Sequence, residues 1–172
     1  KVKSEEAFIE EMKEKYKTED RIDWDIITID PSLSKDFDDG LSLIEKEDSY
    51  IFSIYISNVS FWMDALDLWS SFSQRITTIY LPDRKRPMLP TVLSDALCSL
   101  QEKRMRFAFT LDVCVDKESY EIKNVSFKNC CIRVRDNFRY DTESQENDET
   151  YKSIKAFIFE INKKYRYVDN IE

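Results

Sequence analysis

The scarcity of glycine constrains this chain more than any other feature of its sequence. Gly40 is the single glycine among 172 residues, although glycine normally makes up about 7% of a protein. Folds that bind nucleotides through a glycine-rich loop need several glycines at fixed spacing, because the backbone must approach the phosphates closely. That class of phosphate-binding loop is therefore excluded.

Histidine is absent altogether. Its absence excludes Ser-His-Asp and Cys-His catalysis, histidine-paired phosphodiester cleavage and HExxH metalloproteases. A Cys/His zinc site is excluded as well, and no CxxC pair is present. We expect the four cysteines to be buried free thiols of an intracellular protein: Cys98, Cys114, Cys130 and Cys131. If the chain performs chemistry alone, carboxylates and a metal ion are the leading candidates.

Composition predicts one ordinary domain. Hydrophobic residues make up 42% of the chain and aromatic residues 13%, which is too much for a disordered acidic polypeptide. There is no apolar run of membrane-spanning length and no signal-peptide pattern, so we expect a cytoplasmic or nuclear protein. The net charge of −8 argues against nonspecific coating of nucleic acid over the whole surface.

Hydrophobic periodicity predicts an α+β fold with a mixed, largely antiparallel sheet and packed helices. An amphipathic pattern predicts helices over 5–17, 64–75 and from Tyr151 to Tyr165. Strands are expected at 24–29, 41–46, 50–57, 77–81 and 131–135, with a hairpin formed by 106–115 and 120–127. Prolines between 82 and 90 predict an extended, turn-rich path there, and 141–149 reads as a loop.

The stretch DPSLSKDFDD, residues 30–39, places four aspartates in one short loop between two apolar runs. Like charges about 4 Å apart repel by roughly 1 kcal/mol in water and about 4 kcal/mol at the effective dielectric of a protein surface. One interpretation is a solvated acidic turn, in which aspartate side chains bond nearby amides. The flanking strands argue against it, because they hold the carboxylates close together.

Two metal sites are the alternatives for this loop. An EF-hand loop starting at Asp36 would place Asp38 and Glu47 at ligand positions, but Leu41 stands where that loop needs glycine. A catalytic magnesium site fits better, because Mg²⁺ shares carboxylates with waters and substrate phosphates. Two such ions roughly 3.5 to 4 Å apart can cleave a phosphodiester without histidine.

Four stretches together resemble the ribonuclease II family, whose RNB catalytic domain characterises 3′-to-5′ exoribonucleases. TIDPSLSKDFDDGLSL, residues 28–43, is similar to the family's four-aspartate signature, with aspartates six, eight and nine positions after the first. YISNVSFW (55–62), YLPDRKRPMLPTVLSDALCSL (80–100) and CIRVRDNFRY (131–140) follow in family order. The resemblance covers about residues 20–140, and it implies the N-terminal portion of an RNB-type domain over 20–172, preceded by a lead-in helix over 1–19.

The resemblance implies the roles of individual residues. Asp30, Asp36, Asp38 and Asp39 are expected to be catalytic and to hold Mg²⁺, for which Mn²⁺ would substitute, with Asp38 the most sensitive to mutation. Tyr80 and Tyr140 match the two tyrosines that clamp RNA near its 3′ end, and stacking of this kind tolerates any sequence. We expect Arg84 and Arg86, from a basic cluster within the third motif, to line the path of the RNA backbone.

The implied activity is Mg-dependent hydrolysis of single-stranded RNA from its 3′ end, releasing nucleoside 5′-monophosphates. The family's later arginine-rich segment is absent, so other domains or chains would supply that part of the site. Tyr55 also replaces a common histidine and Asn58 an aspartate. A noncatalytic RNB-like module that binds RNA or protein is the alternative, although retention of all four aspartates favours the enzyme.

Overall fold

The computed structural model of the protein describes residues 5–34, 36–72, 77–86, 88–140 and 143–165. Its centre is a seven-stranded sheet with the order β1-β8-β7-β4-β3-β2-β9. β1 pairs with β8 and β2 with β9 in parallel, and the other neighbours are antiparallel. The strands are β1 Glu19–Arg21, β2 Ile27–Asp30, β3 Asp39–Glu45, β4 Ser49–Ser57, β7 Met105–Asp116, β8 Ile122–Arg133 and β9 Asp136–Arg139. The expected mixed, largely antiparallel sheet is confirmed.

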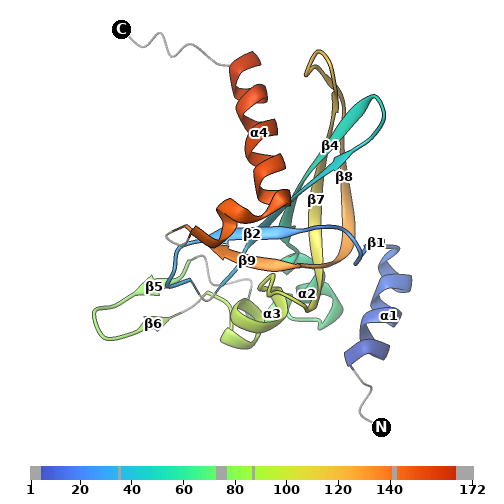
Figure 1. The fold of residues 1–172 in the computed structure, drawn as a ribbon. Helices are drawn as coiled ribbons and strands as arrows, with labels where there is room; N and C mark the ends of the chain where they lie inside the picture. Colours follow the sequence, from blue (N-terminus) through green and yellow to red (C-terminus); the bar gives the residue numbers. More distant parts are fainter. Residues whose placement is uncertain (1–4, 35, 73–76, 87, 141–142, 166–172) are drawn as a thin grey trace, which may run out of the picture.

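Helices lie at both ends of this sheet (Figure 1). They are α1 Glu5–Tyr16, α2 Val59–Ala65, α3 Trp69–Phe72, the π-helix η1 Val92–Cys98, the 3₁₀-helix η2 Glu143–Asn147 and α4 Glu149–Lys164. A small hairpin of β5 Ile79–Tyr80 and β6 Lys85–Arg86 projects from the sheet (Figure 1). In the described part of the chain, no helix is long and apolar enough to cross a bilayer.

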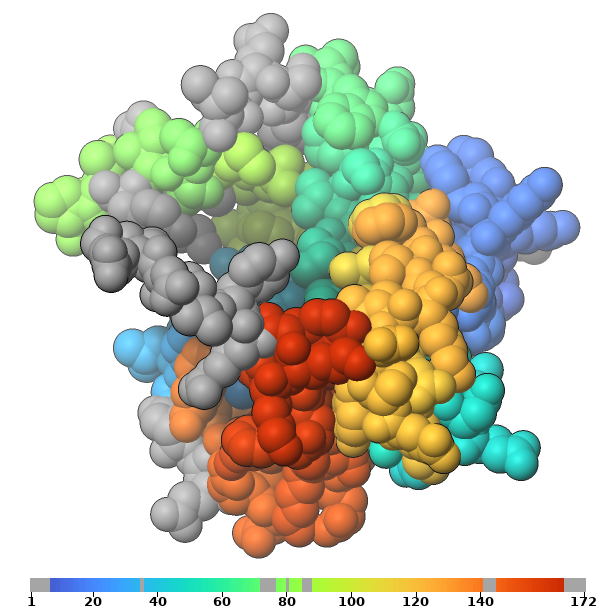
Figure 2. Space-filling model, turned by 90° about the horizontal axis from the view of Figure 1, so that it is seen from above, coloured from blue at the N-terminus to red at the C-terminus, as the bar shows by residue number. Residues whose placement is uncertain are grey.

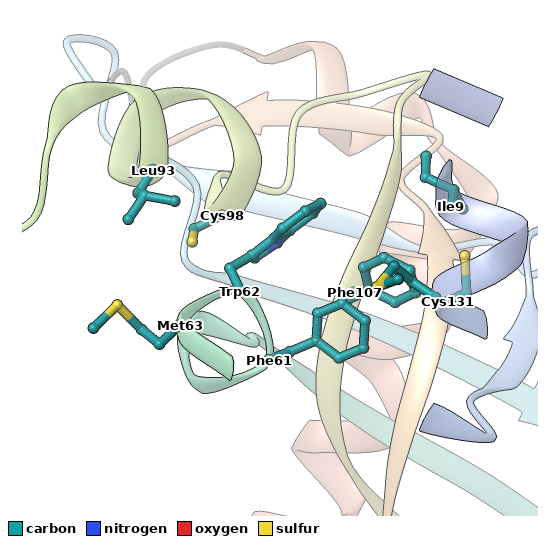
Figure 3. Close-up of a cluster of buried hydrophobic side chains, with 9 residues drawn as sticks. Ile9, Phe61, Trp62, Met63, Leu93, Cys98, Phe107 and Cys131 are labelled. Atoms are coloured by element: carbon teal, nitrogen blue, oxygen red, sulfur yellow. The ribbon is translucent and has the colours of Figure 1, made fainter. Parts of the chain in front are cut away.

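The larger apolar core lies where α1, α2 and η1 meet β7 and β8. Figure 3 shows Phe61 and Trp62 of α2 pointing toward Phe107 of β7, with Ile9 and Cys131 beyond it. The Phe61 and Phe107 rings are stacked with their centroids 3.9 Å apart. Burial of such large aromatic side chains dominates the energetics of small cores, so this cluster joins the helices to the strands.

A buried ion pair between Arg21 of β1 and Asp112 of β7 anchors β1 to the sheet. Arg21 is 1% exposed and donates two hydrogen bonds to the Asp112 carboxylate, at 2.7 and 2.6 Å. Its guanidinium carbon lies 4.1 Å from the Trp24 ring centroid. The Ser53 hydroxyl donates to Asp112 at 2.7 Å. Arg21, the last residue of β1, is therefore held by partners far away in the sequence.

The prediction of one continuous helix over 64–75 is wrong in two respects. The helix begins earlier than expected, and it is interrupted. The Asn58 side chain accepts a hydrogen bond from the Phe61 amide at 3.0 Å, which caps α2 and starts it at Val59. Asp67 has φ 52°, and this left-handed residue separates α2 from α3. The end of the expected helix, at 73–75, lies outside the described residues.

The separate strand expected over 131–135 is also wrong. Its first residues are the end of β8, which runs without a break from Ile122 to Arg133, and β9 begins only at Asp136. The long hairpin of β7 and β8 is confirmed, although it extends further than the expected 106–127. The region of the three prolines leads into η1, which was not predicted, and the expected loop over 141–149 contains η2.

The final helix is confirmed. α4 begins two residues before the expected start because Asp148 caps it, accepting a hydrogen bond from the Tyr151 amide at 2.9 Å. Figure 2 shows α4 (red) beside the tip of the β7–β8 hairpin (gold). There, the Ile122 amide donates to the Tyr165 hydroxyl at 3.2 Å. The C-terminal helix is therefore tied to the sheet.

Candidate active site

The acidic loop connects two neighbouring strands of the sheet. Asp30 is the last residue of β2 and Asp39 the first residue of β3, and the two strands pair antiparallel through Ile27 and Leu41. A short connection between antiparallel neighbours brings its two ends together. The predicted location of the aspartates, at the junction of two core strands, is confirmed.

Gly40 allows this close approach. A β-carbon at residue 40 would lie 3.3 Å from the Ile26 side chain and 3.4 Å from the Ile27 carbonyl oxygen. The first of these contacts is tighter than ordinary van der Waals packing and the second is at its lower limit, and glycine avoids both. The one glycine of the chain thus stands directly beside Asp39, where β3 runs alongside the buried residues Ile26 and Ile27.

Hydrogen bonds to other elements hold the second half of the loop. The Phe37 amide donates to the Ser99 hydroxyl at 3.1 Å, and its carbonyl accepts from the Leu100 amide at 2.7 Å. The Asp38 carbonyl accepts from the Ser57 amide at 2.8 Å. Phe37 is itself 7% exposed. These contacts fix the backbone between Asp36 and Asp38, two of the four predicted ligands.

The carboxylates of this junction influence one another. Burial raises the pKa of Asp30, which is 8% exposed, and the negative charges of Asp39 and Asp38 raise it further. A hydrogen bond from Thr28 and the positive charge of Arg139 oppose that rise in pKa. Asp36 is half-buried, whereas Asp38 and Asp39 are exposed. The fold therefore concentrates negative charge at one end of β2.

The donors at this junction fit a hard divalent cation. The Oδ2 atom of Asp30 is buried and has no hydrogen-bond partner among the described residues, and such an oxygen is a natural ligand for a metal ion. Within the same residues, no three acidic or cysteine side chains are already grouped around one point. Waters and substrate phosphates commonly complete the coordination of Mg²⁺, so a ligand set of this kind need not be complete in the protein alone.

β9 brings an arginine and a tyrosine to the same place. Arg139 is the register partner of Asp30, and the Tyr140 amide donates to the Asp30 carbonyl at 2.9 Å. The Tyr140 side chain is 65% exposed. It borders a cavity of about 350 Å³ that Asp39, Ile29 and Tyr151 also line. A predicted RNA-binding tyrosine and a predicted metal ligand thus share one cavity.

The remaining predicted RNA-binding residues lie in the β5–β6 hairpin. Tyr80 pairs with Lys85 in this hairpin, and Arg86 pairs with Ile79; the side chains of Tyr80 and Arg86 are outside the described part of the structure. Arg84 is exposed, with its Nε 3.8 Å from the Asp83 carboxylate. The described contacts do not connect Arg84 to the acidic loop, so its role in RNA binding stays a prediction.

A family model described as the RNB domain matches residues 18–164. The chain belongs to the RNB family. This RNB chain is 34% identical over 129 residues to Ribonuclease R of Ureaplasma parvum, which covers 74% of the chain and 17% of that protein. It spans less than a fifth of the length of this relative and of Ribonuclease R of Chlamydia trachomatis.

Solved structures show the same RNB fold. The apo form of Mycoplasma genitalium RNase R matches with a TM-score of 0.73 and 25% identity, covering 90% of this chain and 25% of that one. The same protein has been solved in complex with ribose-methylated single-stranded RNA. Yeast Ssd1, a pseudonuclease, matches with a TM-score of 0.70 at 13% identity over 88% of this chain and 19% of that one. The RNB fold alone therefore does not decide whether a chain cleaves RNA.

The two substitutions in the second RNB-like motif have structural roles in this chain. Tyr55 is fully buried, and its hydroxyl lies 2.9 Å from that of Ser42 and 3.4 Å from the Arg21 guanidinium. Asn58 caps α2 and donates to the Asn129 side chain at 2.9 Å. Neither residue is among the four aspartates of the acidic loop.

Sequence reasoning did not assign a role to Arg139, Ser57 or Ser99. All three hold the acidic loop through side-chain or backbone hydrogen bonds to it. Ser99 and Ser57 lie 60 and 18 positions beyond Asp39 (99 − 39 and 57 − 39), and only the tertiary fold brings them near. The basic character of Arg139 was the one available signal, but a charged residue in a strand is usually no more than solvated surface.

Proposed function

We propose that this RNB chain supplies the carboxylates of a Mg²⁺-dependent exoribonuclease site that shortens single-stranded RNA from its 3′ end and releases nucleoside 5′-monophosphates. The observation that carries the proposal is that the negative charges of Asp38 and Asp39 act on the buried Asp30 at the β2–β3 junction of an RNB fold. Like charges are costly to hold together in a partly buried place. A bound cation would remove that cost.

In the proposed site, Asp30, Asp36, Asp38 and Asp39 would hold Mg²⁺ beside the scissile phosphate. The ion supplies Lewis-acid stabilisation of the phosphate and a water of lowered pKa. The buried oxygen of Asp30 provides a rigid ligand, because β2 and β9 fix its backbone. Asp38 and Asp39 are exposed and would be accessible to an approaching RNA. Mn²⁺, which also accepts oxygen ligands, would substitute for Mg²⁺.

Tyr140 would stack on a base near the 3′ end of the RNA. Its exposed ring stands at the mouth of a cavity that Asp39 also lines, which suits a base positioned next to the reacting phosphate. Tyr80, Arg84 and Arg86 would extend the RNA path along the β5–β6 hairpin. Stacking on aromatic faces works for every base, which an enzyme that degrades any sequence requires.

The chain spans less than a fifth of the length of these two Ribonuclease R relatives, and we propose that arginines outside it complete the site. The decisive test is a chimera in which these residues replace the matching segment of Ureaplasma parvum Ribonuclease R. With Mg²⁺ and a single-stranded RNA labelled at its 5′ end, we expect progressive shortening that EDTA and Asp38→Asn both abolish. The 172-residue chain alone should cleave weakly or not at all.

A noncatalytic RNB module is the second candidate. It is favoured by the absence of a preassembled group of three metal ligands among the described side chains and by the similarity of the fold to a pseudonuclease. In the chimera experiment this candidate predicts RNA binding without shortening. An active chimera that Asp38→Asn leaves unaffected would instead show that the cleavage does not use this loop.

A further inference from the structure

Arg139 contacts the acidic loop at three places. Its Nη1 donates to the Pro31 carbonyl at 3.1 Å and to the Ser34 carbonyl at 3.0 Å. Its guanidinium carbon lies 5.0 Å from the centroid of the Phe37 ring. These three residues lie between Asp30 and Asp38, so one side chain touches the loop near its start, in its middle and close to its end.

The backbone of Arg139 is also held beside the acidic loop. Arg139 is the last residue of β9 and the register partner of Asp30. Tyr140, the next residue, is hydrogen-bonded through its amide to the Asp30 carbonyl. The arginine backbone is therefore fixed by the sheet beside one predicted metal ligand, while its head group reaches across the loop that carries the others.

A guanidinium group is well suited to bind these backbone carbonyls and the Phe37 ring at the same time. It is planar, always charged and rich in donors, and it also stacks on aromatic faces. The carbonyls of Pro31 and Ser34 are acceptors in a loop that has no regular ladder of its own, and backbone acceptors of this kind need partners. The Ser34 amide donates to the Pro31 carbonyl at 2.9 Å, which closes a turn that Arg139 then binds from outside.

We propose that Arg139 is a positioning residue of the acidic loop: by binding the Pro31–Ser34 turn and the Phe37 ring, it restrains the segment that carries Asp30, Asp36 and Asp38, so that these carboxylates can gather around a divalent cation. This inference rests on the proposed function, because it assumes that the loop binds a metal. It assigns Arg139 no contact with RNA and no part in proton transfer.

Removal of Arg139 should change the metal affinity in opposite directions, depending on whether the residue acts through its charge or by positioning the loop. If Arg139 acted only through its positive charge, it would repel a cation, and its removal would tighten metal binding. If it acts by positioning, its removal loosens the loop and weakens metal binding. Loss of a residue that orients metal ligands typically weakens metal affinity by about 10- to 100-fold. The sign of the change therefore separates the two roles.

The test measures Mn²⁺ binding to the 172-residue chain by electron paramagnetic resonance of free Mn²⁺. We expect Arg139→Gln to weaken binding by about 10-fold and Arg139→Lys to weaken it less, because lysine keeps a donor for the carbonyls. The matched control is Arg133→Gln, since Arg133 is an exposed β8 arginine whose Nη2 lies 3.6 Å from the carboxylate of Asp23, a residue outside the acidic loop. That control should bind Mn²⁺ as the unaltered chain does.

Amide hydrogen exchange of residues 31–34 and 36–38 is the second readout, with circular dichroism as a check that each variant folds. Faster exchange confined to this loop in Arg139→Gln supports positioning. Equal or tighter Mn²⁺ binding by Arg139→Gln, or the same loss in Arg133→Gln, would overturn the inference while leaving the metal site intact. Failure of the unaltered chain to bind Mn²⁺, both alone and with a single-stranded RNA oligonucleotide, would refute the proposed metal site, and the role of Arg139 with it.

Discussion

The amide of Tyr140 donates a hydrogen bond to the carbonyl of Asp30 at 2.9 Å. This bond joins the end of β9 to the end of β2, although the two residues are 110 positions apart (140 − 30). Its consequence is that the backbones that carry an exposed aromatic ring and a buried carboxylate are joined at one corner of the sheet. A base stacked on Tyr140 would therefore lie near the proposed metal ligands.

Replacing the Tyr140 ring should weaken RNA binding. Tyr140→Ala is expected to reduce the affinity of the chimera for a single-stranded oligonucleotide by about 1–3 kcal/mol, the usual contribution of one stacked base. Tyr140→Phe keeps the aromatic face and should bind almost normally. Fluorescence anisotropy of a labelled RNA measures both. An equal loss in the two variants would point to the hydroxyl group and contradict stacking.

The buried pair of Arg21 and Asp112 should be essential for stability. Asp112→Ala removes the two hydrogen bonds that hold the buried Arg21 guanidinium and leaves the half-exposed Glu19 as its remaining ionic partner, and we expect it to lower the free energy of unfolding by about 3–5 kcal/mol. Lys152→Ala is the matched control, because it removes an exposed pair with Glu149 and should cost less than about 1 kcal/mol. Urea denaturation distinguishes the two. Similar costs would show that the buried pair contributes little.

The acidic loop should cost stability at neutral pH. Burial raises the pKa of Asp30 in the folded protein above its unfolded value of about 3.9. Between those two pKa values the folded state binds more protons than the unfolded state, so stability falls as pH rises through this window. Asp30→Asn should therefore raise the Tm at pH 7, and this gain should disappear as the pH falls below about 3.9. Thermal unfolding followed at several pH values measures it, and a lower Tm for Asp30→Asn at pH 7 would contradict the pKa shift.

Gly40 should not tolerate a side chain. Gly40→Ala places a methyl group 3.3 Å from the Ile26 side chain, and overpacking of this kind costs about 1–3 kcal/mol. Because Asp39 is the preceding residue, we also expect Mn²⁺ binding to weaken. Chemical denaturation and metal titration test the two effects separately. A fully stable Gly40→Ala chain would show that β3 can move away from β2 at no cost.

The parts of the fold that could be predicted are those with a local signal. The alternating pattern of β3 and β4 and the apolar face of α4 were recognisable because burial repeats along each element. β1 could not be recognised in the same way. Its three residues are polar, and its place in the sheet depends on the pairing of Arg21 with Asp112, 91 positions further along the chain (112 − 21).

In the candidate site, too, only the features with a local sequence signal could be predicted. The spacing of the four aspartates located the acidic loop, and the structure places it where the flanking strands predicted. The residues that hold the loop lie on β9, β4 and the segment after η1, so no local pattern connects them to it. Asn58 illustrates the limit most clearly: it was treated as a departure from the family pattern, whereas its side chain determines where α2 begins.

The most direct test of the central claim is anomalous diffraction from a crystal of the chain soaked in Mn²⁺ with an RNA oligonucleotide bound. Mn²⁺ takes oxygen ligands and scatters anomalously, so its position can be seen without assumptions about activity. We predict a peak within coordination distance of the Asp30 Oδ2 atom and of at least one of Asp36, Asp38 and Asp39. A map without an anomalous peak at the β2–β3 junction would contradict the claim that these carboxylates bind divalent cations.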